Sequence, residues 1–234
     1  MLVIKAARNI IRIVGLVALS LSAMPLASMA ADDLPQVSPE GLELQKDTKA
    51  RAVYLKPGFS LAPYKRVAIL DCFVDFAKDW QKDFNRDQMG AGNRVTTKDM
   101  DRIKADLAAE FKKIFTDELQ TKGGYEVVDT AAPDVLVLRP AIINLAITGP
   151  DLQSPNMNRT IVESAGQMTL YIELYDSVSN TILARVMDPK ADNRGMAQSA
   201  NRVSNKAAAD RILRQWAGTL REHLDAAQGK APAK

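Results

Sequence analysis

The sequence of 234 residues predicts an α+β or α/β fold in which a mixed β-sheet packs against two long helices, all in one domain. Segments with strand-like alternation come before and between two segments with helical spacing. The composition, 47% hydrophobic and 25% charged, is ordinary for a folded protein. About 175 residues lie between two polar ends, which is enough for one core.

The first thirty residues resemble a secretory signal peptide. Three basic residues precede the apolar run at 13–21, which is too short to span a bilayer. Small residues then predict cleavage between Ala30 and Ala31. We therefore expect a mature protein in the bacterial periplasm. The alternatives are an uncleaved anchor and peripheral attachment to the envelope.

Removing this leader changes the charge balance. The full chain has 31 basic and 28 acidic residues, and the leader holds three of the basic ones, so 28 of each remain. A neutral mature chain does not favour nucleic-acid binding by counterion release. No later run is apolar enough for a transmembrane segment in the mature chain. One His and one Cys exclude multi-His metal sites and an intrachain disulfide.

Residues 31–50 are polar and contain two prolines, which predicts a flexible N-terminal arm. The domain is expected at 51–226, followed by a disordered tail at 227–234. Residues 66–76 are apolar on one face and mostly apolar on the other, which predicts one central strand.

Two segments have helical spacing. The first helix is expected over about 98–121, capped by Thr96 or Thr97 and ended by Gly123 and Gly124. The second is expected over about 205–226, capped by Ser204 or Asn205. Their apolar stripes contain Leu107, Phe111, Ile114, Phe115 and Leu119, then Ile212, Leu213, Trp216, Leu220 and Leu224.

The remaining strands follow from alternation. Short and long strands are expected at 125–128 and 134–148, with a bulge or an edge position at Arg139 and Pro140. Residues 168–175 predict a strand with one buried and one solvated face, joined by a hairpin turn to 181–187. Residues 149–158 and 189–204 are expected to be irregular.

Several separated segments resemble, in order, a bacterial envelope family named as domain of unknown function 3313. They are AVYLKPGFSLAPYKRVAI, FAKDWQKDFNR, DMDRIKADLAAEFKKIFTDEL, GGYEVVDTAAPDVLVLRPAI, AGQMTLYIELYDSVSNTILARV and NKAAADRILRQWAGTLREHLDA. The family typically comprises lipoproteins with no assigned activity, although this chain has no cysteine at the cleavage site. A looser likeness to TolB N-terminal-like envelope domains implies an α/β sandwich and transfers little about function.

Three aspartates, Asp71, Asp75 and Asp79, lie at or after the end of the first strand. Such carboxylates can bind a hard cation, but the spacing and glycine of a calcium loop are missing, so a solvated strand end is the favoured interpretation. Trp80 and Phe84 mark either an exposed contact surface or a helical turn packed on the core. Arg139 can bind a ligand carboxylate or pair with an internal acid.

The predicted interaction surface combines polar and aromatic residues from these segments with residues before the last helix: Asp75, Asp79, Trp80, Asp83, Asn85, Arg86, Arg139, Arg194, Asn201 and Asn205. Cys72 is expected to be an inert core thiol and His223 a packing or surface residue. No nucleophile motif or phosphate loop is present, so no catalytic residue, metal or cofactor is predicted.

These observations favour a non-enzymatic periplasmic accessory domain that binds an envelope protein or a cell-wall component. One alternative is a protein that binds a small ligand or a cation. Another is a hydrolase that uses carboxylates alone.

Overall fold

The computed structural model describes residues 34–87, 94–148, 160–200 and 202–230, with the backbone alone at 160–165, 192–200 and 202–204. The expected signal peptide, the 149–158 loop and Asn201 lie outside the described residues. From Pro35 onward the chain forms one compact unit. Its elements are, in order, β1 (Glu43–Leu44), β2 (Ala52–Leu55), β3 (Arg66–Ile69), β4 (Phe73–Phe76), α1 (Trp80–Asp87), α2 (Thr97–Thr116), the π-helical turn η2 (Asp117–Lys122), β5 (Glu126–Val127), β6 (Val135–Ile147), β7 (Thr160–Asp176), β8 (Ile182–Ala200) and α3 (Arg202–Ala227).

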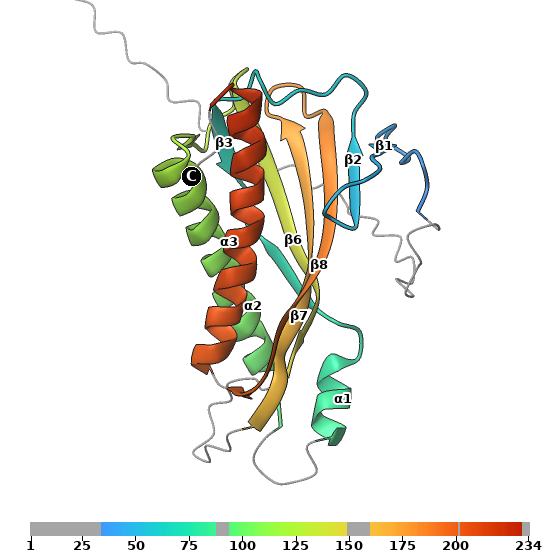
Figure 1. Ribbon diagram of the computed structural model, residues 1–234, viewed down its shortest axis with the longest axis vertical. Helices are drawn as coiled ribbons and strands as arrows, with labels where there is room; N and C mark the ends of the chain where they lie inside the picture. Colours follow the sequence, from blue (N-terminus) through green and yellow to red (C-terminus); the bar gives the residue numbers. More distant parts are fainter. Residues whose placement is uncertain (1–33, 88–93, 149–159, 201, 231–234) are drawn as a thin grey trace, which may run out of the picture. The chain divides into compact units, whose positions relative to one another are not determined.

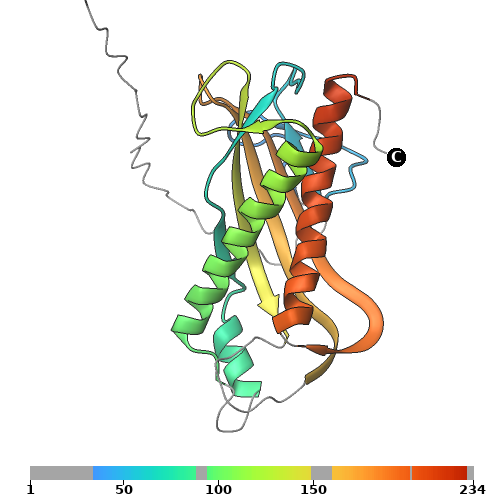
Figure 2. The same ribbon diagram turned by 90° about the vertical axis from the view of Figure 1, so that its left-hand side faces the viewer.

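The strands form one mixed sheet of eight. Its order is β1-β2-β8-β7-β6-β3-β5, and β4 also pairs with β6. β6 is parallel to β3 and β4 but antiparallel to β7. Helices α2 and α3 run side by side over one face of the sheet (Figure 1; Figure 2). The predicted fold class, a single α+β domain with two long helices on a mixed sheet, is confirmed.

The strand expected at 66–76 is divided into β3 and β4. β3 pairs with Val135–Leu138 of β6, and β4 pairs with β6 from Ala141 onward. The Leu138 carbonyl accepts a 3.0 Å hydrogen bond from the Leu70 N–H, so the main chain of Pro140, two residues later, faces the same side. Proline has no N–H to donate and lies where β6 changes partner. Of the two predicted alternatives at Arg139 and Pro140, the bulge is wrong, since the irregularity lies between Ile143 and Ala146. The edge position has a local counterpart, because the pairing of β6 with β3 ends at Leu138 and that with β4 begins at Ala141.

Both long helices bury the predicted stripes. Thr96 caps α2 in a capping box with Asp99, which satisfies main-chain donors at the helix start. The helix continues through η2 to Lys122, close to the expected end. α3 begins at Arg202, so Ser204 and Asn205 lie within its first turn and the predicted cap at these residues is wrong. The buried stripes of the two helices form the core with one face of the sheet.

The second face of β7 is not solvated as expected. Thr169 and Glu173 are 8% and 6% exposed. Glu173 accepts hydrogen bonds from Tyr171, Tyr175 and Arg185, so its carboxylate is buried with partners. The irregular segment expected at 189–204 is also corrected. β8 continues to Ala200, because its main chain pairs with β7 along this stretch.

Part of the segment expected to be a flexible arm is packed against the sheet. Leu42 is fully buried, and β1 pairs with β2. The guanidinium of Arg185 donates to both carboxylate oxygens of Glu40, at 2.9 and 3.0 Å. These contacts order residues 35–44 despite their polar composition.

Residues 227–230, expected to be disordered, also make contacts. Gln228 donates to main-chain carbonyls of the turn before β3, at 2.8 Å for Ala62 and 3.1 Å for Tyr64. Lys230 donates to the Gly123 carbonyl at 2.8 Å. The end of α3 is thereby fixed to two loops. None of the described helices combines the length and the apolar character needed to cross a membrane.

Candidate functional site

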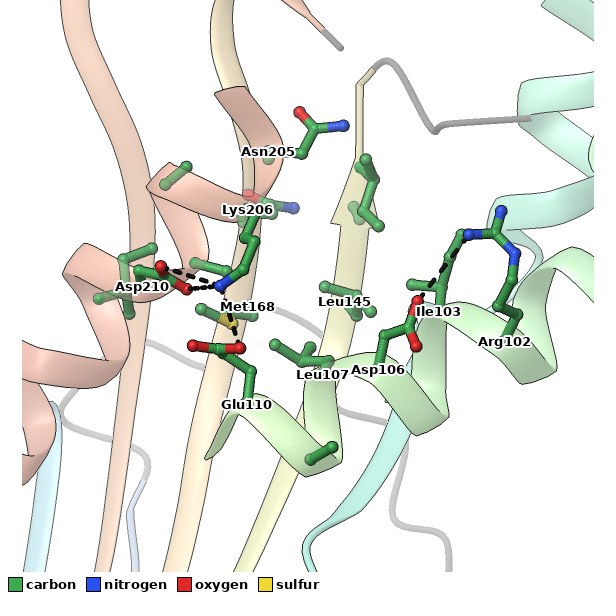
Figure 3. A pocket seen from close by; sticks show the side chains of 18 residues that line it. Arg102, Ile103, Asp106, Leu107, Glu110, Leu145, Met168, Asn205, Lys206 and Asp210 are labelled. Atoms are coloured by element: carbon green, nitrogen blue, oxygen red, sulfur yellow. Dashed lines mark hydrogen bonds and ion pairs between the residues drawn. The ribbon is translucent and has the colours of Figure 1, made fainter. Parts of the chain in front are cut away.

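A cavity of about 410 Å³ lies where the first halves of α2 and α3 pass over the ends of β6 and β7. Its apolar lining includes the side chains of Leu107, Leu145, Met168 and Ile212, each less than a tenth exposed. Figure 3 shows these side chains between the two helices and the strands. A volume of this size is within the range of sites that bind small molecules.

Small side chains create this space. On α2 the facing turn carries Ala109, and on α3 it carries Ala208 and Ala209. A larger residue at Ala208 or Ala209, which are buried and half-buried, would fill the gap between the helices. Phe111 and Leu213 fill it further along the same helices, where both are fully buried. The space is therefore a consequence of the sequence of both helices.

Charged side chains surround the opening (Figure 3). Lys206 on α3 places its Nζ 3.0 Å from Glu110 Oε2 on α2 and 3.0 Å from Asp210 Oδ1. Burial acts to lower the pKa of Lys206, but hydrogen bonds to these two carboxylates outweigh it and raise that pKa. Arg102 lies 3.9 Å from Asp106 and 3.8 Å from Asp99. The opening thus combines an apolar interior with a polar rim.

A second, more open hollow of about 560 Å³ adjoins the cavity. The two share four lining residues at the end of β6 and in β7: Ala146, Ile147, Gly166 and Gln167. Trp80 and Phe84 of α1 line its other side, with Asp83 and Asp87. Trp80 stacks on Phe76 at 4.4 Å and on Phe84 at 5.4 Å between ring centroids. The aromatic face of α1 is therefore held against β4 beside the cavity.

Gly166 is required at the wall between the two hollows. A Cβ placed there would lie 2.5 Å from the carbonyl oxygen of Ala146, and the φ angle of Gly166 is +154°. Only glycine allows β7 to approach β6 this closely. The distance between the two strands at this wall therefore depends on the glycine at position 166.

The structure brings together part of the predicted interaction surface. Trp80 and Asp83 line the second hollow, and Asn205 lines the cavity. Asn85 donates to and accepts from the main chain of Val95, so it fixes α1 to the segment before α2. Arg86 pairs with Asp83 at 2.9 Å on the surface of α1. The predicted helical turn is present, and Trp80 packs against the core, whereas the exposed contact surface stays a prediction.

The other predicted residues lie elsewhere. Asp75 pairs with Lys104 at 2.7 Å. Asp79 has a φ angle of +60° just before α1, where its carbonyl accepts from the Asp83 N–H. Arg139 lies 3.5 Å from Glu173, which confirms its pairing with an internal acid. Asn201 and the side chain of Arg194 are outside the described part of the chain.

The three aspartates considered for a cation do not gather. Asp71 is almost fully exposed and lies 3.4 Å from Lys112. Within the described ranges, no group of three or more His, Cys, Asp or Glu side chains could hold a metal ion. Cys72 is buried, and burial raises the pKa of its thiol to about 12. His223 is exposed on α3.

Comparison with protein families finds a match over most of the chain. The model of the family described as "Protein of unknown function (DUF3313)" matches residues 35–220. The chain belongs to this family. The matched region of this DUF3313 protein includes every described residue that lines the cavity. The looser likeness to TolB N-terminal domains is not tested by this match and stays a prediction.

Solved structures similar to this DUF3313 chain have low identity. A PelC dodecamer from Paraburkholderia phytofirmans, in two crystal forms, is 14% and 13% identical to this chain, with a TM-score of 0.34 in both. The alignments cover 69% and 70% of this chain, and 90% of that chain in both cases. A protein described as a "putative lipoprotein" from Caulobacter crescentus is 10% identical, with a TM-score of 0.30 and coverage of 74% of this chain and 96% of that one. These TM-scores carry no conclusion about function. Comparison with curated proteins finds no match.

The cavity is the feature that the sequence patterns missed. Its lining comes from two helices and two strands that are distant in the sequence. One signal was present: the segments DLAAE and KAAAD, at 106–110 and 206–210, each place consecutive alanines between acidic or basic residues. Small residues at matching positions of two neighbouring helices indicate a gap once the helices are known to face each other.

Proposed function

We propose that this protein is a non-enzymatic binding protein of the bacterial cell envelope, and that its ligand is a small molecule with an apolar body. The observation that carries the proposal is the cavity between α2, α3 and the ends of β6 and β7. Its interior is apolar, its rim is polar, and it is formed by rigid elements of the fold. Such a site stabilises a bound apolar group mainly by removing it from water.

Three features of the described residues support a role without catalysis. The thiol of Cys72 is buried, and its raised pKa disfavours the reactive thiolate. Asp71 and Asp75 lie near lysines of α2, at separations that favour ion pairs over acid–base work. The polar groups around the cavity are similarly paired with one another. If purified protein turned over a compound and lost this activity on substitution of one acidic residue, the proposal would fail.

The proposed location is the periplasm, after cleavage between Ala30 and Ala31. The basic start, short apolar run and small residues of the leader support this placement. The mass of the protein recovered from a bacterial periplasmic fraction tests it. A mature N-terminus at Ala31 is expected, whereas a full-length chain recovered with membranes would contradict the proposal.

A second candidate function is contact with an envelope partner protein at the α1 end. The observation that favours it is the open hollow beside Trp80 and Asp83. A photoreactive residue at Arg86, whose side chain is 64% exposed, should then crosslink in cells to one defined protein. The same probe at His223, which is exposed on α3, is the control. Equal crosslinking from both positions would oppose this candidate.

The cavity is tested by a neutral fluorescent apolar probe, N-phenylnaphthylamine. We expect saturable binding at one site, with an increase in fluorescence as the probe leaves water. Ala209→Phe, at a half-buried position of the lining, places a ring in the cavity and should weaken binding about tenfold or more. Ala207→Phe, exposed on the same helix and outside the lining, is the matched control and should bind as the unmodified protein does. Absence of saturable binding, or equal binding by both variants, would overturn the proposed function.

A further inference from the structure

The ammonium group of Lys206 lies at the opening of the cavity. Lys206 Nζ lies between two carboxylates, 3.0 Å from Glu110 Oε2 across the gap to α2 and 3.0 Å from Asp210 Oδ1 on its own helix. Figure 3 shows the side chain extending from α3 toward Glu110 above the apolar lining. The Lys206 side chain is 52% exposed, so it can move outward into water. The Glu110 and Asp210 side chains that it leaves, 18% and 27% exposed, then need another cation.

Acidic side chains outnumber basic side chains in the lining of the cavity. Two are basic, Arg102 and Lys206, and three are acidic, Asp106, Glu110 and Asp210. Outside the lining, Asp99 shares Arg102 with Asp106, and Lys113 lies 3.8 Å from Glu110. With both of these neighbours included, four acidic side chains face three basic ones. An anionic ligand at this opening would therefore meet more negative than positive charge, whereas a cationic ligand would improve the balance.

We propose that the ligand is an amphipathic amine, with an apolar body that fills the cavity and an ammonium group that replaces Lys206 between Glu110 and Asp210. This inference rests on the proposed function, since it names the ligand class of the same cavity. An ammonium attached to the ligand would make the charge-assisted contacts with Glu110 and Asp210 that Lys206 makes now. An aminophospholipid would also bring a phosphate against these carboxylates, so the proposal is for a free amine.

The direct test is displacement of N-phenylnaphthylamine by octylamine, octanol and octanoate, which share one apolar chain and differ in the end group. We expect octylamine to act at a concentration about tenfold lower than octanol, and octanoate to be the weakest. Dihexanoylphosphatidylethanolamine, below its micelle concentration, should be weaker than octylamine. Equal displacement by the three octyl compounds, or a stronger effect of the phospholipid, would overturn the amine proposal.

Substitution of Lys206 should strengthen the binding of the amine and leave the binding of the alcohol unchanged. In Lys206→Met the competing ammonium is removed while Glu110 and Asp210 remain, so octylamine should bind several-fold more tightly and octanol about as before. Lys112→Met, on α2 outside the lining, is the matched control and should change neither value. Unchanged or weaker octylamine binding by Lys206→Met would contradict the proposal.

The carboxylates provide the complementary variant. Glu110→Gln combined with Asp210→Asn keeps the size of both side chains and should reduce octylamine to the affinity of octanol. Octylamine that still binds more tightly than octanol would overturn the assignment of these residues. Failure of the amine proposal differs from failure of the proposed function, because octanol and the neutral probe would still bind in the first case and would not bind in the second.

Discussion

The indole Nε1 of Trp216 donates a hydrogen bond of 2.9 Å to Oδ2 of Asp188, and both side chains are buried. This bond links the middle of α3 to β8, on the face of the sheet that the helices cover. Lys190 lies 3.3 Å from the same oxygen. A buried carboxylate is costly unless it has such partners, so the pair fixes the position of α3 over the sheet.

Trp216→Phe should lower the free energy of unfolding by about 1–3 kcal/mol, because Asp188 would lose a buried donor. Urea unfolding measures this change. Asp188→Asn keeps an acceptor for the indole and should cost less than Trp216→Phe. If Trp216→Phe were as stable as the unmodified protein, the hydrogen bond would not have the structural role given to it.

Glu40 gives a pH-dependent prediction. Hydrogen bonds from Arg185, with a further one from Ser38, lower the pKa of Glu40 from an ordinary value of 4.5 to about 2. Because the pKa of Glu40 is lower in the folded state, its ionised form stabilises the fold fully above pH 4.5, and this stabilisation is lost as the pH falls toward 2. Solvent screening limits it to about 1 kcal/mol, since the side chain is 42% exposed.

Glu40→Gln should therefore be less stable than the unmodified protein at pH 7, and the difference should shrink between pH 5 and pH 2. Urea unfolding at several pH values provides the measurement. Glu43→Gln, on β1 but outside the Arg185 pair, serves as the control. A difference that stays constant across this pH range would contradict the assigned ion pair.

Gly166→Ala should destabilise the protein by about 2 kcal/mol or more, because the new Cβ would meet the main chain of β6 at 2.5 Å. Gly58→Ala is a useful comparison. Its φ angle is +72° and no atom lies within 4 Å of the added Cβ, so only the backbone strain of about 1 kcal/mol should appear. Equal unfolding free energies for the two variants would show that the close approach of β6 and β7 is not restrictive.

Ala209→Phe should leave the unfolding free energy unchanged or slightly higher, because the ring fills an existing space. Thermal unfolding of this variant and of Ala207→Phe provides the comparison. A loss of probe binding together with retained stability separates a blocked cavity from a damaged fold. A large fall in melting temperature for Ala209→Phe alone would instead indicate that the space between the helices is already filled.

Local sequence patterns correctly predicted those elements whose buried face does not depend on the side chains of a neighbouring element. The stripe of α2 and η2, from Leu107 to Leu119, has the same spacing in the sequence and in the core. The predicted solvated face of β7 was wrong for a non-local reason. Glu173 is buried because Arg185 lies opposite it on β8, and no pattern within one strand shows which charge lies across from it.

The order at the ends of the domain was not predicted from the sequence, for a similar reason. Residues 35–44 are polar in composition, and their order comes from the burial of Leu42, the pairing of β1 with β2 and the contact of Glu40 with the distant Arg185. The cavity depends on alanines of α2 and α3 that face each other only after folding. Composition indicates how a segment behaves alone, whereas these features depend on which segments meet.

The position of a bound apolar ligand tests the central claim most directly. A crystal of the protein grown with brominated octanol would show the bromine by its anomalous signal. We expect one principal peak in the cavity, near Leu107, Met168 and Ile212, and its absence from crystals of Ala209→Phe. A principal bromine peak elsewhere on the protein, with the cavity empty at a saturating ligand concentration, would contradict the account.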